Sequence, residues 1–393
     1  MKTLRIAFLL FCALVLLAVP VLTLASATAE PVYSLYENRN LAGRPGLTLS
    51  GLLSGEYFEA WEAYLRDRVW QRDRLLRADA ALQTALSRPF VNDVLVSDEA
   101  LLPYVTGIDP GSVAADAARM ADALSALSEQ VAAYGGVFLY VGVPNQYSAC
   151  RAGYPDYMDY VGEGLDAARD AFFAALDERG VAWLDMNEVF ADPAAFYFHT
   201  DHHMDLPGSV ETCRAIFDAL RGMGIEIPDH LSDVTYRALP NPFYGSRGRK
   251  LYGLGGMTEE LLVYDRAPEV AYSRRDYDGT ENAPLIALPE TGSEPVSYGI
   301  FTGGDMAETV ITTDRPALSS ALIFGDSYTN TIETAFYTGF DETRSLDLRY
   351  YGDVSLSDYL AQHRPRVVVC VRDDANYLNF TGNGNLHGDA EIR

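Results

Sequence analysis

Apolar residues recur at helical spacing in several stretches of the chain and form short unbroken runs between them. Helices are expected at 57–87 (broken once), 110–134, 163–179, about 209–223, near 330–337 and 356–363. The apolar runs, typical of buried strands, lie at 136–144, 181–186, 321–327, 345–351 and 366–372. This alternation of helix and strand predicts an α/β fold with a parallel sheet.

The alternation lapses in one long stretch that is rich in Gly, Pro, Tyr and Thr. We interpret residues 228–317 as a β-rich insertion. The layered domain is then split into a first part, 110–227, and a second part, 318–393. Residues 30–109 form an N-terminal linker and helical region, in which the polar stretch SLYENRNLAGRP is expected to be an extended linker.

The first 29 residues carry Lys2 and Arg5, then an apolar run from Ile6 to Leu24, then small residues up to Ala29. Such a segment is a signal peptide or a membrane anchor, because the apolar run is long enough to span a bilayer. Cleavage and retention are both open at this point. In either case the body of the protein is expected outside the cytoplasm.

The net charge excludes some classes of partner, and the cysteine count bears on how the fold is stabilised. The chain has 55 acidic and 30 basic residues and a formal net charge of −25, so it should repel nucleic acid and anionic membrane surfaces. Beyond the leader only Cys150, Cys213 and Cys370 remain, which argues against a disulfide framework. With 48% hydrophobic residues the chain can bury a full-sized core.

ALIFGDSYTN places a serine where open α/β sheets bind ligands. Ser327 is expected at the carboxyl end of a parallel strand, just before a helix N-terminus whose free N–H groups favour an oxyanion. Gly325 is expected to permit a tight turn, and Asn330 with Glu333 to cap the helix. Gly-Asp-Ser is also ordinary turn composition, so the motif needs a partner before it indicates a nucleophile.

FYFHTDHHMDLPGS supplies the partner. In extended backbone, residues two apart project to the same side, so the carboxylate of Asp201 can orient the ring of His203, which then faces Ser327. His202 would point the other way.

The same stretch has two other interpretations. His199 and His203 have the i, i+4 spacing of zinc ligands on a helix, but the segment is unlike a helix and no third ligand follows, so we predict no metal. A polar surface loop without chemistry is the second alternative.

Five ordered motifs together resemble the bacterial DHHW proteins, relatives of the SGNH-hydrolase-like proteins that O-acetylate alginate and other exported polysaccharides. They are ENRNLAGRP (37–45), DRVWQR (67–72), FHTDHHM (198–204), FGDSYTN (324–330) and DLRYYGDVSLSDYL (347–360). The resemblance implies a flavodoxin-like three-layer α/β/α sandwich, with Ser327 as nucleophile, His203 as base and Asp201 as its orienting carboxylate. The sequence departs from the family at Met204, where Trp is usual, and has no clear C-terminal carbohydrate-binding domain, so alginate itself is not implied.

Further candidate residues for the substrate or the oxyanion follow strand ends or the nucleophile. They are Tyr328, Arg349, Asn376 and Asn145, the last together with its neighbour Gln146. Tyr154, Tyr157 and Tyr160 are aromatic side chains that could stack on sugar rings, although packing is the more ordinary role.

The sequence thus predicts an extracytoplasmic serine O-acetyltransferase or esterase that acts on acetyl groups of a cell-envelope or exported polysaccharide. No cofactor is expected, and the resemblance implies an acetyl donor delivered by a membrane acyltransferase. The alternative is a non-catalytic glycan-binding or membrane-complex accessory protein of the cell envelope, which the long N-terminal helix would also suit.

Overall fold

The computed structural model describes residues 2–28, 32–37, 39–97 and 99–386. The chain divides into two compact units. The smaller unit comprises Met1–Val94 and Gly248–Gly256, and the larger comprises Leu95–Arg247 and Met257–Arg393.

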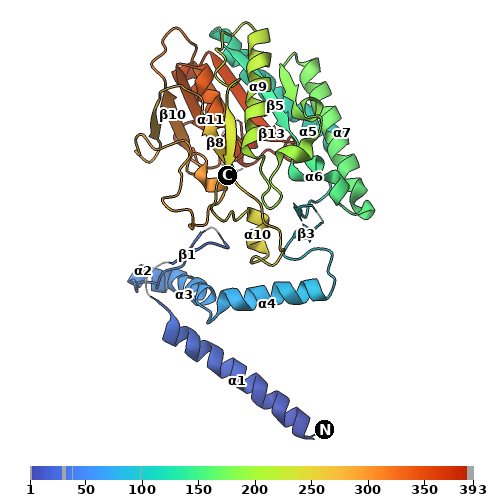
Figure 1. The fold of residues 1–393 in the computed structure, drawn as a ribbon, viewed down its shortest axis with the longest axis vertical. Coiled ribbons are helices and arrows are strands. Elements are labelled where there is room, and N and C mark those ends of the chain that lie inside the picture. The colour runs from blue at the N-terminus through green and yellow to red at the C-terminus, as the bar shows by residue number, and fades with distance from the viewer. Residues whose placement is uncertain (1, 29–31, 38, 98, 387–393) are drawn as a thin grey trace. The chain divides into compact units, whose positions relative to one another are not determined.

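A seven-stranded sheet forms the centre of the larger unit, in the order β6-β5-β13-β11-β12-β10-β9 (Figure 1). Its strands are β5 (Val137–Val143), β6 (Trp183–Asp185), β9 (Ser273–Asp276), β10 (Glu308–Thr312), β11 (Ala321–Gly325), β12 (Glu342–Leu346) and β13 (Val367–Asp373). The five from β6 to β12 run parallel, while β10 and β9 add antiparallel at the β12 edge.

Helices cover both faces of this sheet. One face packs on α5 (Val113–Ala133), α7 (Asp159–Glu178) and α12 (Leu356–His363), the other on α9 (Leu206–Gly222) and α11 (Thr329–Phe336). Alternate residues of β5 supply the two cores, with Phe138 and Tyr140 in the first and Leu139 and Val141 in the second, because strand side chains alternate in direction. The predicted three-layer α/β/α fold is confirmed.

The chain also contains several short strands, helices and 3₁₀ turns. The strand pairs are β3 (Val94–Val96) with β4 (Leu101–Pro103), and β7 (Thr235–Ala238) with β8 (Leu262–Arg266). The short α-helices are α6 (Gln146–Ala149), α8 (Met186–Val189) and α10 (Ser246–Lys250). The 3₁₀ turns are η1 (Arg151–Gly153), η2 (Asp156–Met158), η3 (Pro193–Phe196), η4 (Tyr298–Ile300), η5 (Tyr337–Gly339) and η6 (Gly382–Gly384).

Two strand expectations need correction. The stretch expected as an insertion contributes β9 and β10 to the central sheet, so its last part extends the sheet. The strand expected at 345–351 is β12 and already ends at Leu346. The chain turns there because the carboxylate of Asp347 accepts the N–H of Arg349 at 3.0 Å and its carbonyl accepts the N–H of Tyr351 at 2.8 Å.

The smaller unit is mainly helical. Its elements are α1 (Lys2–Ser26), β1 (Val32–Ser34), β2 (Arg39–Leu41), α2 (Leu49–Ser54), α3 (Glu56–Asp67) and α4 (Arg72–Ala85). The stretch Leu4–Ser26 of α1 has a mean hydropathy of 2.8 and is long and apolar enough to cross a membrane. The break that was expected within the helix 57–87 falls between α3 and α4, where Gln71 adopts a left-handed conformation with φ 58°.

The segment expected as an extended linker contains a hairpin instead. β1 and β2 pair antiparallel, with Tyr33 opposite Asn40. Arg39 of this hairpin donates to both carboxylate oxygens of Asp67 at 2.8 and 2.7 Å, and the N–H of Ala42 donates to the same group at 2.9 Å. The hydrogen bond from Arg39 lowers the pKa of Asp67 to about 2. Two of the family-like motifs, 37–45 and 67–72, therefore hold the smaller unit together.

Gly325 is required for a reason other than a tight turn. A Cβ atom at this position would lie 2.0 Å from the carbonyl oxygen of Val371, so β11 approaches the backbone of β13 too closely for any side chain. We expect Gly325→Ala to lower the free energy of unfolding by about 1–3 kcal/mol in a urea titration. Gly222→Ala is the matched control, since its Cβ would have no neighbour within 4 Å; equal stability of the two variants would contradict the prediction.

Candidate active site

The loop that carries Asp201 and His203 is a tight turn and not the extended strand that was expected. An antiparallel bridge between Tyr197 and Met204 closes it. Inside the loop, one oxygen of the Asp201 carboxylate accepts the N–H of His202 at 2.7 Å and of His203 at 3.3 Å. The aspartate side chain thus folds the residues that follow it, as Asp does in many turns.

The serine lies in the turn between β11 and α11, at the carboxyl end of a parallel strand as predicted. β11 ends at Gly325 and α11 begins at Thr329. Asp326 shapes the turn, because its carboxylate accepts the N–H of Tyr328 at 3.2 Å and its carbonyl accepts the N–H of Thr329 at 3.0 Å. Ser327 itself is half-buried and keeps access to solvent.

The expected capping pair of α11 does not form. The amide of Asn330 donates to Asp305 at 2.9 Å, and Glu333 accepts the hydroxyl of Ser345. No side chain caps the helix at Tyr328. The expectation failed because both residues have tertiary partners from other elements, which a local pattern does not reveal.

The structure brings the three residues of the predicted triad together. The Nε2 atom of His203 lies 2.7 Å from the Ser327 hydroxyl, and its Nδ1 atom lies 2.7 Å from Oδ1 of Asp201. Asp201 is 1% exposed and His203 is 5% exposed, so both are shielded from water. With a proton on Nδ1, the ring donates to the carboxylate and can accept the proton of the serine.

The carboxylate of Asp201 is held in its ionised form. Burial by itself would raise the pKa of this group, but the hydrogen bond from His203 and the N–H of Ser246, which donates to Oδ2 at 2.6 Å, leave it well below its usual value. An ionised, buried carboxylate beside Nδ1 can stabilise a positive charge on the ring.

His202 does not point away from the site, as was expected. Its ring centroid lies 3.8 Å from that of His203, and its Nδ1 atom lies 2.9 Å from the hydroxyl of Ser246. The turn around Asp201 causes this, because it removes the alternation of an extended strand. Asp201, His202 and His203 could offer three metal-ligand atoms within 4.8 Å of one another, while Nδ1 of His203 is engaged by the Asp201 carboxylate.

Tyr298 of η4 is a site residue that the sequence analysis missed. Its ring stacks on the ring of His203, with centroids 3.6 Å apart and planes 3° from parallel. Its hydroxyl donates to the carbonyl of Ser327 at 2.8 Å and accepts the hydroxyl of Thr331 at 2.7 Å. Tyr298 therefore contacts both His203 and Ser327. It lies in the segment 228–317, which was expected to be an insertion, and no motif indicates it there.

Glu259 is a second missed residue from the same segment. Its carboxylate accepts the N–H groups of His199 at 2.6 Å and Thr200 at 2.8 Å, together with the hydroxyl of Thr200. Burial raises the pKa of Glu259, while these hydrogen bonds lower it. The carboxylate fixes the start of the loop that presents Asp201.

The four further candidate residues have different surroundings. The hydroxyl of Tyr328 donates to the carbonyl of His202 at 2.7 Å, which ties the serine turn to the histidine loop. Arg349 pairs with Asp347 and, at 3.0 Å, with Asp305. The amide of Asn376 donates to Asp373 at 2.6 Å.

Asn145 and Gln146 follow β5, and Gln146 contacts the histidine loop. The amide of Gln146 donates to the carbonyls of Phe198 at 3.1 Å and Asp201 at 2.7 Å. Asn145 begins α6 by accepting the N–H of Ser148 at 3.1 Å. Its amide nitrogen is buried and has no hydrogen-bond partner among the described residues.

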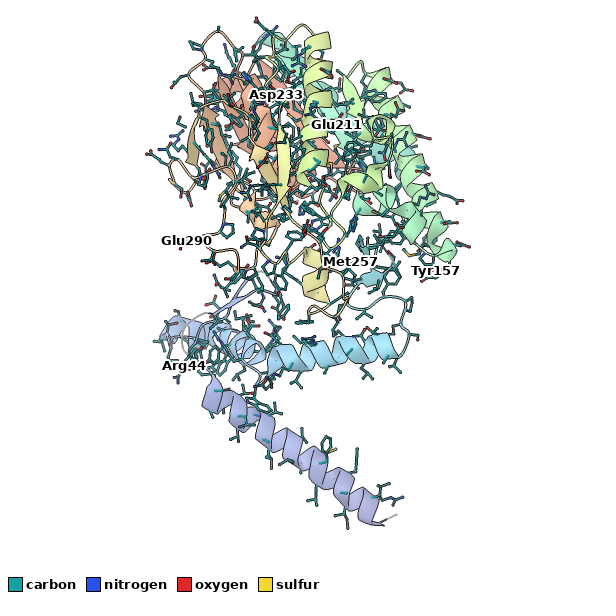
Figure 2. The ribbon with its side chains drawn as sticks, in the orientation of Figure 1. Arg44, Tyr157, Glu211, Asp233, Met257 and Glu290 are labelled. Atoms are coloured by element: carbon teal, nitrogen blue, oxygen red, sulfur yellow. The ribbon has the colours of Figure 1, made fainter. Side chains whose placement is uncertain are left out.

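The residues YPDYMDY divide into packed and exposed rings. Tyr154 is buried, and its hydroxyl donates to the carbonyl of Pro103 at 2.7 Å. Tyr157 and Tyr160 are exposed, and Figure 2 labels Tyr157 at the surface near α7. Only the latter two could stack on a sugar ring.

Met204, where the family usually has Trp, packs in the hydrophobic core that α9 and α11 share with the sheet. Its sulfur accepts the hydroxyl of Thr212 at 3.6 Å. Met204 therefore packs in this core, and the hydrogen bonds of Asp201 and His203 do not involve it.

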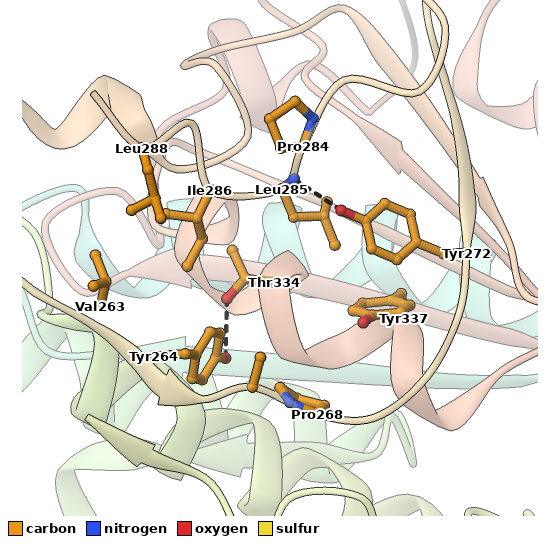
Figure 3. A pocket seen from close by; sticks show the side chains of 11 residues that line it. Val263, Tyr264, Pro268, Tyr272, Pro284, Leu285, Ile286, Leu288, Thr334 and Tyr337 are labelled. Carbon is orange, nitrogen blue, oxygen red and sulfur yellow. Dashed lines mark hydrogen bonds between the residues drawn. The ribbon is translucent and has the colours of Figure 1, made fainter. Parts of the chain in front are cut away.

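An apolar cavity of about 220 Å³ lies at the other end of α11, beside Thr334 and Tyr337 (Figure 3). The hydroxyl of Tyr264 pairs with Thr334 at 3.2 Å, and that of Tyr272 accepts the N–H of Leu285 at 3.1 Å. Because these hydroxyls are already engaged, the lining of the cavity presents mainly carbon atoms to a ligand. Ser327 is not part of this lining, so the cavity does not define the site of the serine.

The comparisons with known proteins agree with this fold. Residues 107–245 match the family model described as the SGNH hydrolase-like domain of acetyltransferase AlgX. The structure of Bacillus cereus PatB1 with a sulfonyl adduct is similar with a TM-score of 0.59 at 21% identity, over 72% of this chain and 97% of that one. A DHHW family protein from Eubacterium siraeum is similar with a TM-score of 0.55 at 17% identity, over 74% of this chain and 93% of that one. The search of curated proteins found no match.

The larger unit therefore has the fold of SGNH hydrolase-like proteins, and residues 107–245 are similar to that domain of an acetyltransferase. The resemblance that the motifs indicated is confirmed at this level.

Several buried carboxyl groups near the site predict how stability depends on pH. Burial raises the pKa of Asp374 and of Glu333 to about 7 and that of Asp205 to about 6. The folded protein then binds more protons than the unfolded chain between about pH 4 and pH 7, so its stability falls as the pH rises through this range. We expect the urea midpoint to be higher at pH 5.5 than at pH 8.

The matched control for this prediction is Glu333→Gln, which removes one of the titrating groups from the core. Its urea midpoint should change less between the two pH values than that of the natural chain. A midpoint that rises steadily from pH 5.5 to pH 8 in the natural chain would contradict the prediction.

Proposed function

We propose that the protein is an extracytoplasmic serine O-acyltransferase or esterase that acts on acetyl groups of a cell-envelope or exported polysaccharide. The observation that carries the proposal is the row of hydrogen bonds from Asp201 through His203 to Ser327, each 2.7 Å long. A serine needs such a base to become a nucleophile at neutral pH. The match of residues 107–245 to an acetyltransferase domain supports acetyl as the group transferred.

The reaction follows from this geometry in two steps. The Ser327 oxygen attacks the carbonyl carbon of an acetyl ester while Nε2 of His203 takes the serine proton, and Asp201 stabilises the resulting imidazolium. The tetrahedral intermediate collapses, and His203 returns the proton to the departing alcohol. A sugar hydroxyl or water then attacks the carbonyl carbon of the acetyl-serine while Nε2 of His203 takes the acceptor's proton. The second tetrahedral intermediate breaks its bond to the Ser327 oxygen, which receives the proton from His203, and the acetylated sugar or acetic acid leaves.

The negative charge on the tetrahedral oxygen requires hydrogen-bond donors. Asp326 already engages the N–H groups of Tyr328 and Thr329, so the N–H of Ser327 is the donor that we propose from this turn. The buried amide nitrogen of Asn145, which lacks a partner among the described residues, is the proposed second donor.

The family model favours transfer to a glycan over hydrolysis, because it describes an acetyltransferase domain. The acetyl donor would then be delivered by a membrane acyltransferase, which suits a protein whose α1 is apolar enough to cross a membrane. The chemistry uses only side chains and backbone of this chain and asks for no cofactor.

We expect Ser327→Ala to lower the turnover of p-nitrophenyl acetate by at least about 10³-fold and to abolish covalent labelling by a sulfonyl fluoride. A sulfonyl reagent suits this test because PatB1 forms a sulfonyl adduct. His203→Ala should act in the same way, whereas Ser357→Ala, an exposed serine on α12, should leave both readouts unchanged.

Two results would contradict the proposal. One is well-folded natural protein that neither turns over the ester nor reacts with the sulfonyl fluoride, which would favour a non-catalytic glycan-binding protein. The other is stoichiometric zinc in the purified protein, because His203 would then be a ligand and not a base.

The stacked ring of Tyr298 predicts a graded effect on the same reaction. An aromatic face against an imidazolium stabilises its charge by about 0.5–2 kcal/mol, and the hydroxyl of Tyr298 holds the carbonyl of Ser327. Tyr298→Leu, which removes the ring and the hydroxyl, should lower kcat about tenfold with little change in KM.

Tyr298→Phe is the matched control, because it keeps the ring and loses only the hydroxyl. It should recover most of the kcat that the leucine variant loses. If the two variants are equally slow, the stacked ring has no effect of its own and the prediction is wrong.

A further inference from the structure

The helices of the smaller unit expose large apolar side chains along one side of each helix. These residues, here termed the leucine surface, are Leu49, Leu52 and Leu53 of α2, Phe58 and Leu65 of α3, and Leu75, Leu82 and Leu86 of or just after α4. Their spacings of three, four and seven residues place them on a common face within each helix. Leu53 is 80% exposed and Leu82 is 57% exposed. Such a concentration is unusual for a surface that faces only water.

Hydrogen bonds join these helices to the end of α1. The N–H of Trp70, between α3 and α4, donates to the hydroxyl of Thr23 at 2.9 Å, and the hydroxyl of Tyr64 donates to the carbonyl of Thr28 at 2.9 Å. Thr23 is only 5% exposed as a result. The end of α1 is thus joined to α3 and to the residues between α3 and α4 within the smaller unit (Figure 1).

The residues at this junction are those that favour a membrane interface. If α1 crosses a bilayer, Tyr64, Arg68 and Trp70 lie where it emerges. Trp and Tyr are enriched at that level, and the long side chain of an Arg can extend its charged end to the interface. The charge of the residues around this junction is also compatible with contact to an anionic bilayer. Residues 44–88 carry seven arginines and six acidic residues, so they lack the acidic excess with which the whole chain would repel an anionic bilayer.

We propose that α1 is retained as a membrane anchor and that the leucine surface of α2, α3 and α4 rests on the lipid bilayer around the point where α1 emerges. The apolar side chains enter the boundary between headgroups and acyl chains, while the arginines contact lipid phosphates. This proposal is independent of the chemistry at Ser327.

The experiment uses the full chain in vesicles of phosphatidylethanolamine, phosphatidylglycerol and a phosphatidylcholine brominated on its acyl chains near the headgroup. Leu82→Trp adds a tryptophan on the leucine surface, and Thr84→Trp, the matched control, adds one about 200° around the same helix. Both positions are exposed, and the three native tryptophans contribute equally to both variants. Leu75→Trp and Asp73→Trp form a second pair, in case one variant fails to fold.

We expect bromine to quench the fluorescence added at residues 82 and 75 by about half, because an interfacial helix buries its apolar face about 5–10 Å deep. The fluorescence added at residues 84 and 73 should remain unquenched. Equal quenching within each pair would overturn the proposal. A second result would also overturn the proposal: tryptophans at residues 82 and 75 whose fluorescence is protected from aqueous iodide but is not quenched by bromine. In that case a protein, either a partner or a second copy of this chain, would cover the leucine surface.

Discussion

The hydrogen bond between His203 and Ser327 is the contact on which the site depends, because it joins segments 124 residues apart in the chain. Neither residue could act alone, since serine is a weak nucleophile and an unoriented imidazole is a poor base. The parallel sheet makes the contact possible by bringing strand ends to one edge. Ser327 follows β11, and Gln146, which follows β5, holds the carbonyl of Asp201 at 2.7 Å. The loop is therefore attached to the same edge as the serine.

The segment between β6 and β11 provides most of the support for the base. Ser246 donates to the carboxylate of Asp201, Glu259 binds the N–H groups at the start of the loop, and Tyr298 covers the ring of His203. A base on a loop keeps its geometry only when surrounding groups fix it. The same segment adds β10 and β9 to the sheet, so these supporting residues are connected to the rigid core.

The smaller unit meets a different physical requirement. Arg39 and Asp67, which lie in the motifs 37–45 and 67–72, join its hairpin to α3 and take no part in the site around Ser327. This unit also carries the apolar α1 and the leucine surface, which we propose to rest on lipid.

The sequence by itself determined the layers of the larger unit and the residues that meet at its edge. Apolar runs and helical spacing reveal the parallel strands, because burial on both faces selects such residues directly. The pairing of Asp201, His203 and Ser327 was also accessible, because the chemistry of a nucleophile restricts its partners. Tertiary structure alone decided the rest. Tyr298 and Glu259 contact segments that are distant in the sequence. Asn330 and Glu333 do not cap α11, because they form hydrogen bonds with Asp305 and Ser345. Glycine is required at residue 325 because the backbone of β13 lies too close for a side chain. Such contacts depend on how segments pack in space, and no local pattern records them.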